Sequence, residues 1–203
     1  MIINPLKILR NFLKQKLKRD YDDIKIQNGQ KFSHQLNFNL KNIRKIEETY
    51  FRVFSQNSED GIIMYILKSL DIQNVKFIEI GTQDYSESNT RFIFETYSCD
   101  GLIIDPTLDL KKKIEKFLKL WKNNLIIHNY YIDADNIISV LEKYNFINNI
   151  DLFSIDIDGI DYWVIKSLPN KFSKIFIAEY NPYFGPDLEI TVPNEKKYDR
   201  FKK

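Results

Sequence analysis

Between residues 75 and 178 the sequence contains five short runs of apolar residues, and segments with helical periodicity separate them. The apolar runs are short enough for strands, and they lack the apolar–polar alternation of a strand with one solvated face. Continuous runs of this kind are typical of parallel strands that are buried on both faces. Strands that alternate with helices, joined by right-handed crossovers, form a doubly wound sheet. We therefore expect an α/β fold with a doubly wound, mostly parallel sheet.

The expected strands span residues 75–80, 101–104, 125–127, 152–155 and 175–178. The expected helices begin after the caps Ser58 and Asp135 and otherwise span residues 89–97, 106–121 and 161–168. A serine cap followed by Glu59 and Asp60 is typical of a helix N-terminus, where the helix dipole favours negative charge. We expect the buried faces of these helices to include Leu70 and Trp121.

Residues 2–19 are expected to form a basic amphipathic helix, which precedes a polar connector over residues 20–50. The apolar positions recur every three or four residues, at Ile2, Leu6, Leu9, Leu13 and Leu17. The basic residues are Lys7, Arg10, Lys14, Lys16, Lys18 and Arg19. We expect this helix to pack on its own domain or on a partner chain. Contact with an anionic membrane surface is the alternative.

Composition limits the class of protein. Thirty Lys and Arg residues against 28 Asp and Glu residues leave a net charge of +2, which gives no general attraction to nucleic acid. Cys99 is the only cysteine, so the chain forms no internal disulfide, and a reducing compartment is expected. We expect Cys99 to pack as a small apolar residue in a helix-to-strand turn. The sequence contains no long apolar run and no signal peptide, so we expect a cytoplasmic protein, with peripheral membrane association as the alternative.

Gly81 directly follows the first expected strand. In doubly wound sheets, ligands bind outside the carboxyl ends of the strands. A glycine at this point allows a tight turn and a close approach of the ligand. No second and third glycine follow at the spacing that cradles a dinucleotide pyrophosphate. The pattern favours a cofactor without a pyrophosphate, and S-adenosylmethionine (SAM) is the common one.

Acidic residues follow three further strands. Asp105 comes 24 positions after Gly81, where a carboxylate can accept hydrogen bonds from both ribose hydroxyls of an adenosine; a plain helix cap is the alternative. Three carboxylates lie within the six residues 156–161, and like charges this close require an offset by a cation, by SAM or by helix N-terminal amides. We expect Asp161 to cap the next helix and Asp156 to contact a ligand.

Glu179 begins an acidic and polar segment, Glu179-Tyr180-Asn181-Pro182, at the end of the fifth strand, next to the fourth. A structural turn is an equal alternative for this segment. The two histidines, His34 and His128, do not have the spacing of a zinc site, and we interpret His128 as a hydrogen-bonded residue at a strand edge.

Four segments together resemble the FkbM-like family of SAM-dependent methyltransferases, which have a Rossmann-like core. They are Phe54 to Gly61 (FSQNSEDG), Phe77 to Asp84 (FIEIGTQD) continued by Ser88-Asn89-Thr90, Asp151 to Trp163 (DLFSIDIDGIDYW) and Glu179 to Pro186 (EYNPYFGP). The resemblance covers about residues 51–193. It leaves residues 1–50 as a basic helix and connector and residues 194–203 as a polar tail.

The resemblance implies methyl transfer from SAM to a hydroxyl of a small molecule or glycan, often in bacterial surface polysaccharide biosynthesis. Glu79, Gly81 and Asp84 would face the amino-acid end of SAM, and Asn89 continues this motif. Gln56 and Glu59 would close over the cofactor, Asp105 would bind the ribose, and Asp133 would lie near the adenine. Asp156 and Glu179 would face the acceptor, where one of them acts as general base. These two residues could also hold a divalent cation.

Two other functions fit parts of the sequence. Only 21 residues follow Pro182, whereas the family usually continues with another helix and a strand pair. A SAM-fold module that binds or assembles without catalysis is therefore the main alternative. A haloacid-dehalogenase-like phosphatase with Asp156 as nucleophile and Asp158 as acid is the weaker one, because that motif normally opens its domain.

Overall fold

The computed structural model describes residues 5–185 and 187–195, and it contains one five-stranded sheet. All four strand pairs are parallel, and the strand order is β3-β2-β1-β4-β5. The strands are β1 (Asn74–Ile80), β2 (Ser98–Ile104), β3 (Asn124–His128), β4 (Ile150–Ile155) and β5 (Ser173–Ala178). The five expected strands are thus confirmed, and so is the doubly wound α/β class.

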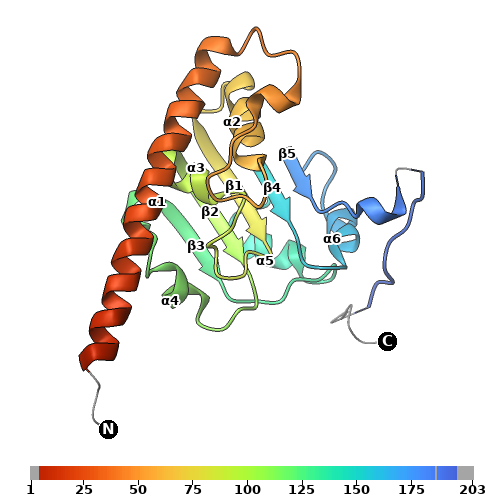
Figure 1. Cartoon of the computed structure of the whole chain (residues 1–203). Helices are drawn as coiled ribbons and strands as arrows, with labels where there is room; N and C mark the ends of the chain where they lie inside the picture. Colours follow the sequence, from red (N-terminus) through yellow and green to blue (C-terminus); the bar gives the residue numbers. More distant parts are fainter. Residues whose placement is uncertain (1–4, 186, 196–203) are drawn as a thin grey trace.

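Helices cover both faces of the sheet (Figure 1). They are α1 (Pro5–Asn39), α2 (Glu59–Ser69), α3 (Arg91–Thr96), α4 (Leu110–Ile114), α5 (Ile137–Lys143) and α6 (Asp161–Ser167). Three short 3-10 helices complete the described elements: η1 (Ile46–Thr49), η2 (Leu120–Lys122) and η3 (Pro182–Phe184). Residues of α1 to α4 share one buried cluster with the sheet, and residues of α5 and α6 share the other.

Alternate residues of each strand enter the two clusters because successive side chains of a strand point to opposite faces. In β1, Phe77 belongs to the cluster of α1 to α4, whereas Ile78 and Ile80 belong to that of α5 and α6. Gly101 in β2 makes room on the first face, since a Cβ there would lie 2.3 Å from the Phe77 ring. The sheet is therefore apolar on both sides, as its continuous apolar runs indicate.

Helix α1 differs from the prediction. It continues to Asn39, so the connector expected from residue 20 is helical over most of its length. The helix contacts the domain through a seam of positions spaced four and three residues apart: Asp22, Ile26, Gly29, Ser33 and Leu36. Only two of these five side chains are aliphatic, which explains why apolar periodicity alone missed this half of the helix.

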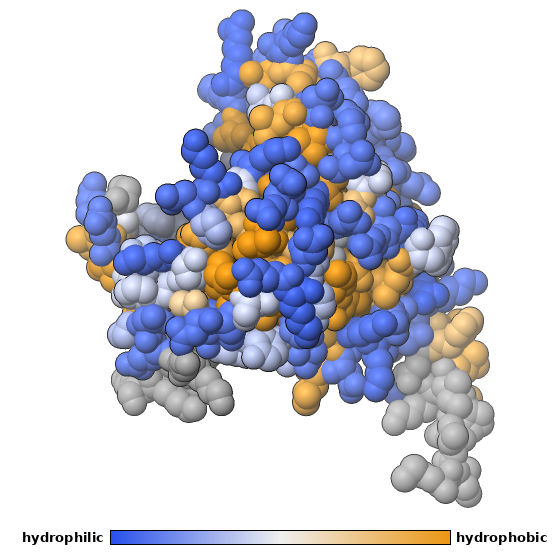
Figure 2. Space-filling view, turned by 180° about the vertical axis from the view of Figure 1, so that it is seen from behind, coloured by the Kyte–Doolittle hydropathy of each residue, from blue (hydrophilic) through white to orange (hydrophobic). Residues whose placement is uncertain are grey.

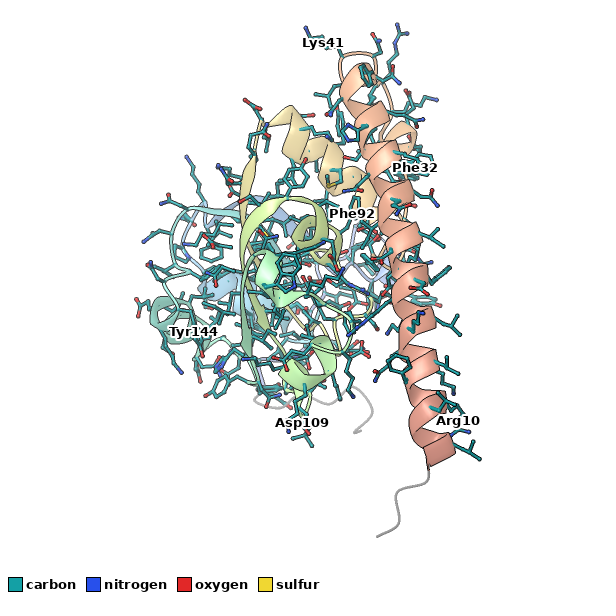
Figure 3. The ribbon with its side chains drawn as sticks, turned by 90° about the vertical axis from the view of Figure 1, so that its left-hand side faces the viewer. Arg10, Phe32, Lys41, Phe92, Asp109 and Tyr144 are labelled. Carbon is teal, nitrogen blue, oxygen red and sulfur yellow. The ribbon has the colours of Figure 1, made fainter. Side chains whose placement is uncertain are left out.

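Two contacts hold the C-terminal half of α1 to the domain. The Asp22 carboxylate accepts a hydrogen bond from Nη2 of Arg91 at 2.6 Å, and the Arg91 side chain is buried. A Cβ on Gly29 would lie 2.4 Å from Val53 and 2.8 Å from the Phe92 ring, so only glycine permits this approach. Figure 3 shows α1 along one side of the domain, with Phe92 beside it. A buried ion pair and a close backbone approach together fix this half of the helix.

The apolar residues of the first half of α1 do not pack on the domain. Leu6, Leu9, Leu13 and Leu17 are all exposed, so the expectation that this stripe packs on its own domain is wrong; Ile2 lies outside the described residues. Within the part of the chain that the structure describes, no helix combines the length and apolar composition needed to cross a membrane.

Some local predictions were also wrong. Leu70 and Trp121 are 51% and 82% exposed. Both were expected on the buried face of a helix, but α2 ends at Ser69 and α4 ends at Ile114, so neither residue belongs to the expected helix. Cys99 lies in β2 rather than in a turn, although it is buried as expected, and burial raises the pKa of its thiol to about 12. Ser58 occupies the N-cap position of α2, but its side chain makes no capping hydrogen bond.

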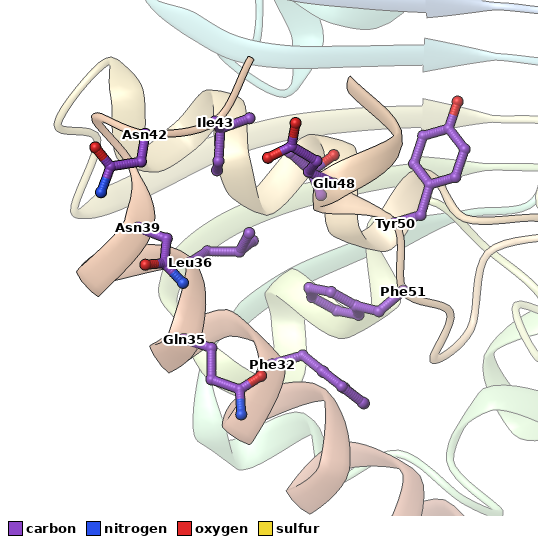
Figure 4. Close-up of a pocket in the computed structure, with 10 residues that line it drawn as sticks. Phe32, Gln35, Leu36, Asn39, Asn42, Ile43, Glu48, Tyr50 and Phe51 are labelled. Atoms are coloured by element: carbon purple, nitrogen blue, oxygen red, sulfur yellow. The ribbon is translucent and has the colours of Figure 1, made fainter. Parts of the chain in front are cut away.

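Two hollows lie along α1. One, of about 330 Å³, lies between the last turns of α1 and residues 42–51, where the Phe32 and Phe51 rings stack at 5.9 Å (Figure 4). The other, of about 300 Å³, lies between the first half of α1 and residues 117–122. Neither hollow is lined by Gly81, Asp105, Asp156 or Glu179, the predicted residues at the carboxyl ends of the strands.

Candidate functional site

Hydrogen bonds join the loops that follow four neighbouring strands. The Gly81 amide donates to the Ile104 carbonyl at 3.0 Å, and the Asp156 amide donates to the Ile80 carbonyl at 3.0 Å. The Asp105 amide donates to the His128 carbonyl at 3.2 Å. The ends of β1, β2, β3 and β4 thus form one continuous edge, with β1 at the point where the strand order reverses. Open α/β sheets bind their ligands at this kind of switch point.

Gly81 stands where the loops after β1 and β4 meet. Its φ is +86°, a conformation that favours glycine. A Cβ at this position would lie 1.6 Å from the Asp156 carbonyl oxygen, so the two backbones touch. The sequence predicted a tight turn here with a close approach of a ligand. In this structure the close approach is to the end of β4.

Glu79, which the resemblance places near SAM, is buried and 5% exposed. Its carboxylate accepts hydrogen bonds from the Ser88 and Thr90 hydroxyls and from the Asn89 and Thr90 amides. Burial raises the pKa of Glu79, and these hydrogen bonds act in the opposite direction. With four donors around one carboxylate, Glu79 positions the 88–90 loop from inside the protein.

Asp105 also has local partners. Its Oδ2 accepts from the Gln83 amide at 2.7 Å, and its Oδ1 accepts from the Thr107 amide at 2.7 Å. The residue is 5% exposed. Asp105 therefore lies beside the Gly81 loop, as the strand-end argument predicted. It fixes the first residues of that loop and the turn after β2 through two hydrogen bonds.

Asp84 and Asn89 lie in the loop between β1 and α3. Asp84 is exposed and accepts a hydrogen bond from the Ser86 amide at 3.0 Å. Partial desolvation of the Asp84 carboxyl raises its pKa, but the hydrogen bonds from Ser86 and the charges of Lys18 and Lys113 outweigh this effect, so the pKa is lowered. The Asn89 side chain donates to the Ser154 hydroxyl of β4 at 3.1 Å. Asp84 is thus accessible to a ligand, whereas Asn89 ties this loop to β4.

The remaining predicted cofactor residues are Gln56, Glu59 and Asp133. Gln56 is exposed, and the Glu59 carboxylate accepts from the Asn57 amide at 2.8 Å at the start of α2. Oδ1 of Asp133 accepts from the amides of Asp135 and Asn136, both at 3.0 Å, immediately before α5. The N-cap of α5 is Asn136, so the expectation that Asp135 caps this helix is wrong, and Asp133 fixes the turn just before it.

Asp156, Asp158 and Glu179 form the most open group at this edge. All three are exposed, and carboxylate oxygens from the three lie within 4.8 Å of one another. Partial desolvation of the carboxyl and the charges of Glu179 and Asp158 raise the pKa of Asp156 to about 6. Asp161 accepts from the Ile157 and Gly159 amides at 2.9 and 3.0 Å and so holds the loop that follows β4. It is the first residue of α6, whose N-cap is Ile160, so the expectation that Asp161 caps this helix is wrong. The structure thus brings together Asp156 and Glu179, the two predicted catalytic residues.

Two other predictions were confirmed. Nδ1 of His128 and the Tyr144 hydroxyl are 2.9 Å apart, and the ring stacks on Tyr130, so His128 is the hydrogen-bonded strand-edge residue that was expected. Burial and the nearby Lys143 charge lower its pKa. Asn181 accepts from the Tyr183 amide at 3.1 Å, which makes the segment after β5 a turn.

Asp60 and Thr82 were missed as residues of interest. Oδ2 of Asp60 accepts from the amides of Val53, Phe54 and Ser55 at 2.7 to 2.8 Å, which anchors the 53–55 segment over α2. Thr82 follows Gly81, and its buried hydroxyl has no hydrogen-bond partner among the described residues. No periodicity indicates these properties, because the partners of Asp60 and the burial of Thr82 both depend on how the loops fold.

Comparisons of the chain with protein-family models, with curated proteins and with solved structures found no match.

Proposed function

We propose that the chain is a SAM-dependent O-methyltransferase that acts on a hydroxyl of a small molecule or glycan, with bacterial surface polysaccharide biosynthesis as the expected context. The resemblance to FkbM-like methyltransferases motivates the proposal. The observation that carries it is the contact of the Gly81 turn with the end of β4, at the switch point of a parallel sheet. This is where a doubly wound sheet binds its ligand.

The residues at this edge fit SAM in three respects. The Gly81 turn lacks the further glycines of a pyrophosphate cradle, as suits a cofactor without one. The buried Thr82 hydroxyl has an unsatisfied hydrogen-bonding capacity next to that turn, which is costly unless something meets it. The repelling carboxylates of Asp156 and Glu179 suit a ligand with positively charged ammonium and sulfonium groups.

The acidic pair suits the acceptor side of the reaction. When bound, SAM supplies an electrophilic methyl group. Asp156, whose pKa is raised to about 6, is ionised at pH 7 and is a stronger base than an ordinary aspartate. It can take the proton of an acceptor hydroxyl that lies within hydrogen-bond reach, while Glu179 orients that hydroxyl. The rest of the rate enhancement would come from positioning the two reactants in line.

The test is calorimetric titration of the full chain with S-adenosylhomocysteine, beside Asp105→Asn and the matched control Asp100→Asn. Asp100 is exposed on the same strand, so its replacement makes the same chemical change away from the site. We expect micromolar binding that Asp105→Asn weakens at least tenfold and that Asp100→Asn leaves unchanged. Circular dichroism of each variant confirms that it is folded.

A second assay separates the enzyme from a module that binds without catalysis. Transfer of a radiolabelled methyl group from SAM to a panel of hydroxylated acceptors is measured with and without Mg²⁺ or Mn²⁺, since Asp156, Asp158 and Glu179 offer oxygen ligands of the kind these ions prefer. Transfer that Asp156→Asn abolishes supports the enzyme. Cofactor binding without transfer to any acceptor favours the non-catalytic module, and a folded chain that binds neither SAM nor its product contradicts both.

A further inference from the structure

A stripe of leucines on α1 faces away from the domain. Leu6, Leu9, Leu13 and Leu17 are between 49% and 73% exposed, and Tyr21 and Ile24 continue the exposed apolar surface. At about 100° per residue these leucines occupy one arc of about 80°, roughly opposite the seam of Asp22, Gly29 and Leu36. Figure 2 shows apolar atoms at the surface on the lower right of the molecule, the side where the N-terminal end of α1 lies, and side chains on the outer side of α1 point away from the domain in Figure 3.

The charge around this stripe is of one sign. Between Pro5 and Arg19 the chain has six basic residues and no acidic one. Arg10 and Lys14 border the stripe on one side, Lys16 borders it on the other, and all three are exposed. An apolar arc with basic side chains on both borders is the pattern of a helix that lies in a membrane interface, with its basic groups at the level of the lipid headgroups.

We propose that the first half of α1 binds the surface of a membrane that contains anionic lipid. The apolar stripe supplies burial in the acyl boundary, and the basic borders supply attraction to acidic headgroups. Pairing of two copies through this stripe would bring two strongly basic segments together, and charge repulsion opposes that arrangement. Charge complementarity therefore favours the lipid surface over a second copy. The inference is independent of the proposed methyl transfer.

The second half of α1 connects this surface rigidly to the domain. The buried Asp22–Arg91 ion pair and the close approach at Gly29 hold that half in place, and Arg19 donates two hydrogen bonds to the Lys116 carbonyl at 2.7 and 3.0 Å. In Figure 1 the N-terminal end of α1 extends beyond the sheet on the side to which the strands point. A membrane-bound α1 would therefore hold the carboxyl ends of the strands in one fixed relation to the bilayer.

The test is co-sedimentation of the full chain with phosphatidylcholine vesicles, with and without about 30% phosphatidylglycerol. The apolar variant is Leu9→Gln/Leu13→Gln/Leu17→Gln, and its control makes the same change at Leu70, Leu108 and Leu188, which are 51% to 80% exposed elsewhere. The charge variant is Arg10→Gln/Lys14→Gln. Its control is Lys41→Gln/Arg44→Gln, at exposed positions just beyond the other end of α1.

We expect binding to the anionic vesicles only, reduced at least fivefold by either α1 variant and by high salt, and unchanged by either control. The proposal is overturned if the α1 variants bind as well as the unaltered chain, or if the chain binds no vesicle at all. A chain that ignores vesicles but associates with itself in analytical ultracentrifugation, through the same three leucines, would replace the lipid with a second copy.

Discussion

At the carboxyl ends of the strands, the acidic residues after β1 and β2 differ in burial and in hydrogen bonding from those after β4 and β5. On the β1–β2 side, the Glu79 and Asp105 carboxylates are buried and accept hydrogen bonds from four donors and two donors respectively. On the β4–β5 side, Asp156, Asp158 and Glu179 are exposed and close to one another. Carboxylates at the ends of strands thus stabilise loops on the β1–β2 side, whereas on the β4–β5 side they repel one another.

The difference indicates where a ligand would change the energy most. A carboxylate that already accepts several hydrogen bonds gains little from a further donor, whereas carboxylates that repel one another gain from any cation or shared proton. The β1–β2 side therefore forms the frame of the candidate site, and the β4–β5 side offers its reactive groups. Four substitutions test this division.

Glu79→Ala should have the largest effect. It removes the carboxylate that accepts from the Ser88 and Thr90 hydroxyls and from two backbone amides, of which only the Thr90 amide has a second acceptor, the Ser88 hydroxyl. We expect the free energy of unfolding to fall by about 3 kcal/mol, the cost of unsatisfied buried polar groups. Urea titration followed by circular dichroism measures it. Glu87→Ala, at an exposed position with a surface partner, should cost less than about 0.5 kcal/mol; equal costs would show that Glu79 is not part of the frame.

Gly81→Ala should rank next, because it combines a disfavoured backbone conformation with a Cβ that meets the Asp156 carbonyl. We expect a loss of about 2 kcal/mol together with weakened binding of S-adenosylhomocysteine. Gly185→Ala is the matched control: its φ is +68°, but nothing lies within 4 Å of an added Cβ. It should show only the backbone cost of about 1 kcal/mol. Indistinguishable losses in the two variants would argue against a tight contact between the β1 and β4 loops.

Asp105→Asn should cost about 1 kcal/mol, since the amide group can accept from only one of the two backbone donors, at Gln83 and Thr107. Thermal unfolding monitored by circular dichroism measures the change. The exposed Asp100→Asn should be neutral by comparison. If Asp105→Asn proved as neutral as its control, the assignment of Asp105 to the frame would fail.

Asp156→Asn should change the free energy of unfolding least, and at neutral pH it should raise that free energy where the other three substitutions lower it. The pKa of Asp156 is about 6 in the folded chain against 3.8 ordinarily, so between these values the folded state binds more protons than the unfolded state. The free energy of unfolding of the unaltered chain should therefore fall as the pH rises from about 4 to 6. That of the variant should fall less over the same range. Because the group is exposed, solvent screening limits the difference to about 1 kcal/mol or less. Urea midpoints at pH 4, 5, 6 and 7 measure it, and parallel pH profiles for the two proteins would contradict the repulsion.

The sequence by itself determined the α/β class and the five parallel strands, because strands buried on both faces require continuous apolar runs. It also predicted that Asp156 and Glu179 would meet, since both end neighbouring parallel strands, and this was confirmed. The tertiary structure alone decided which carboxylates already accept several hydrogen bonds. The donors to Glu79 come from a loop nine to eleven residues away, which no local pattern encodes. It also decided the length of α1, where a seam of Asp22, Gly29 and Ser33 is buried through an ion pair and close packing rather than by apolar area.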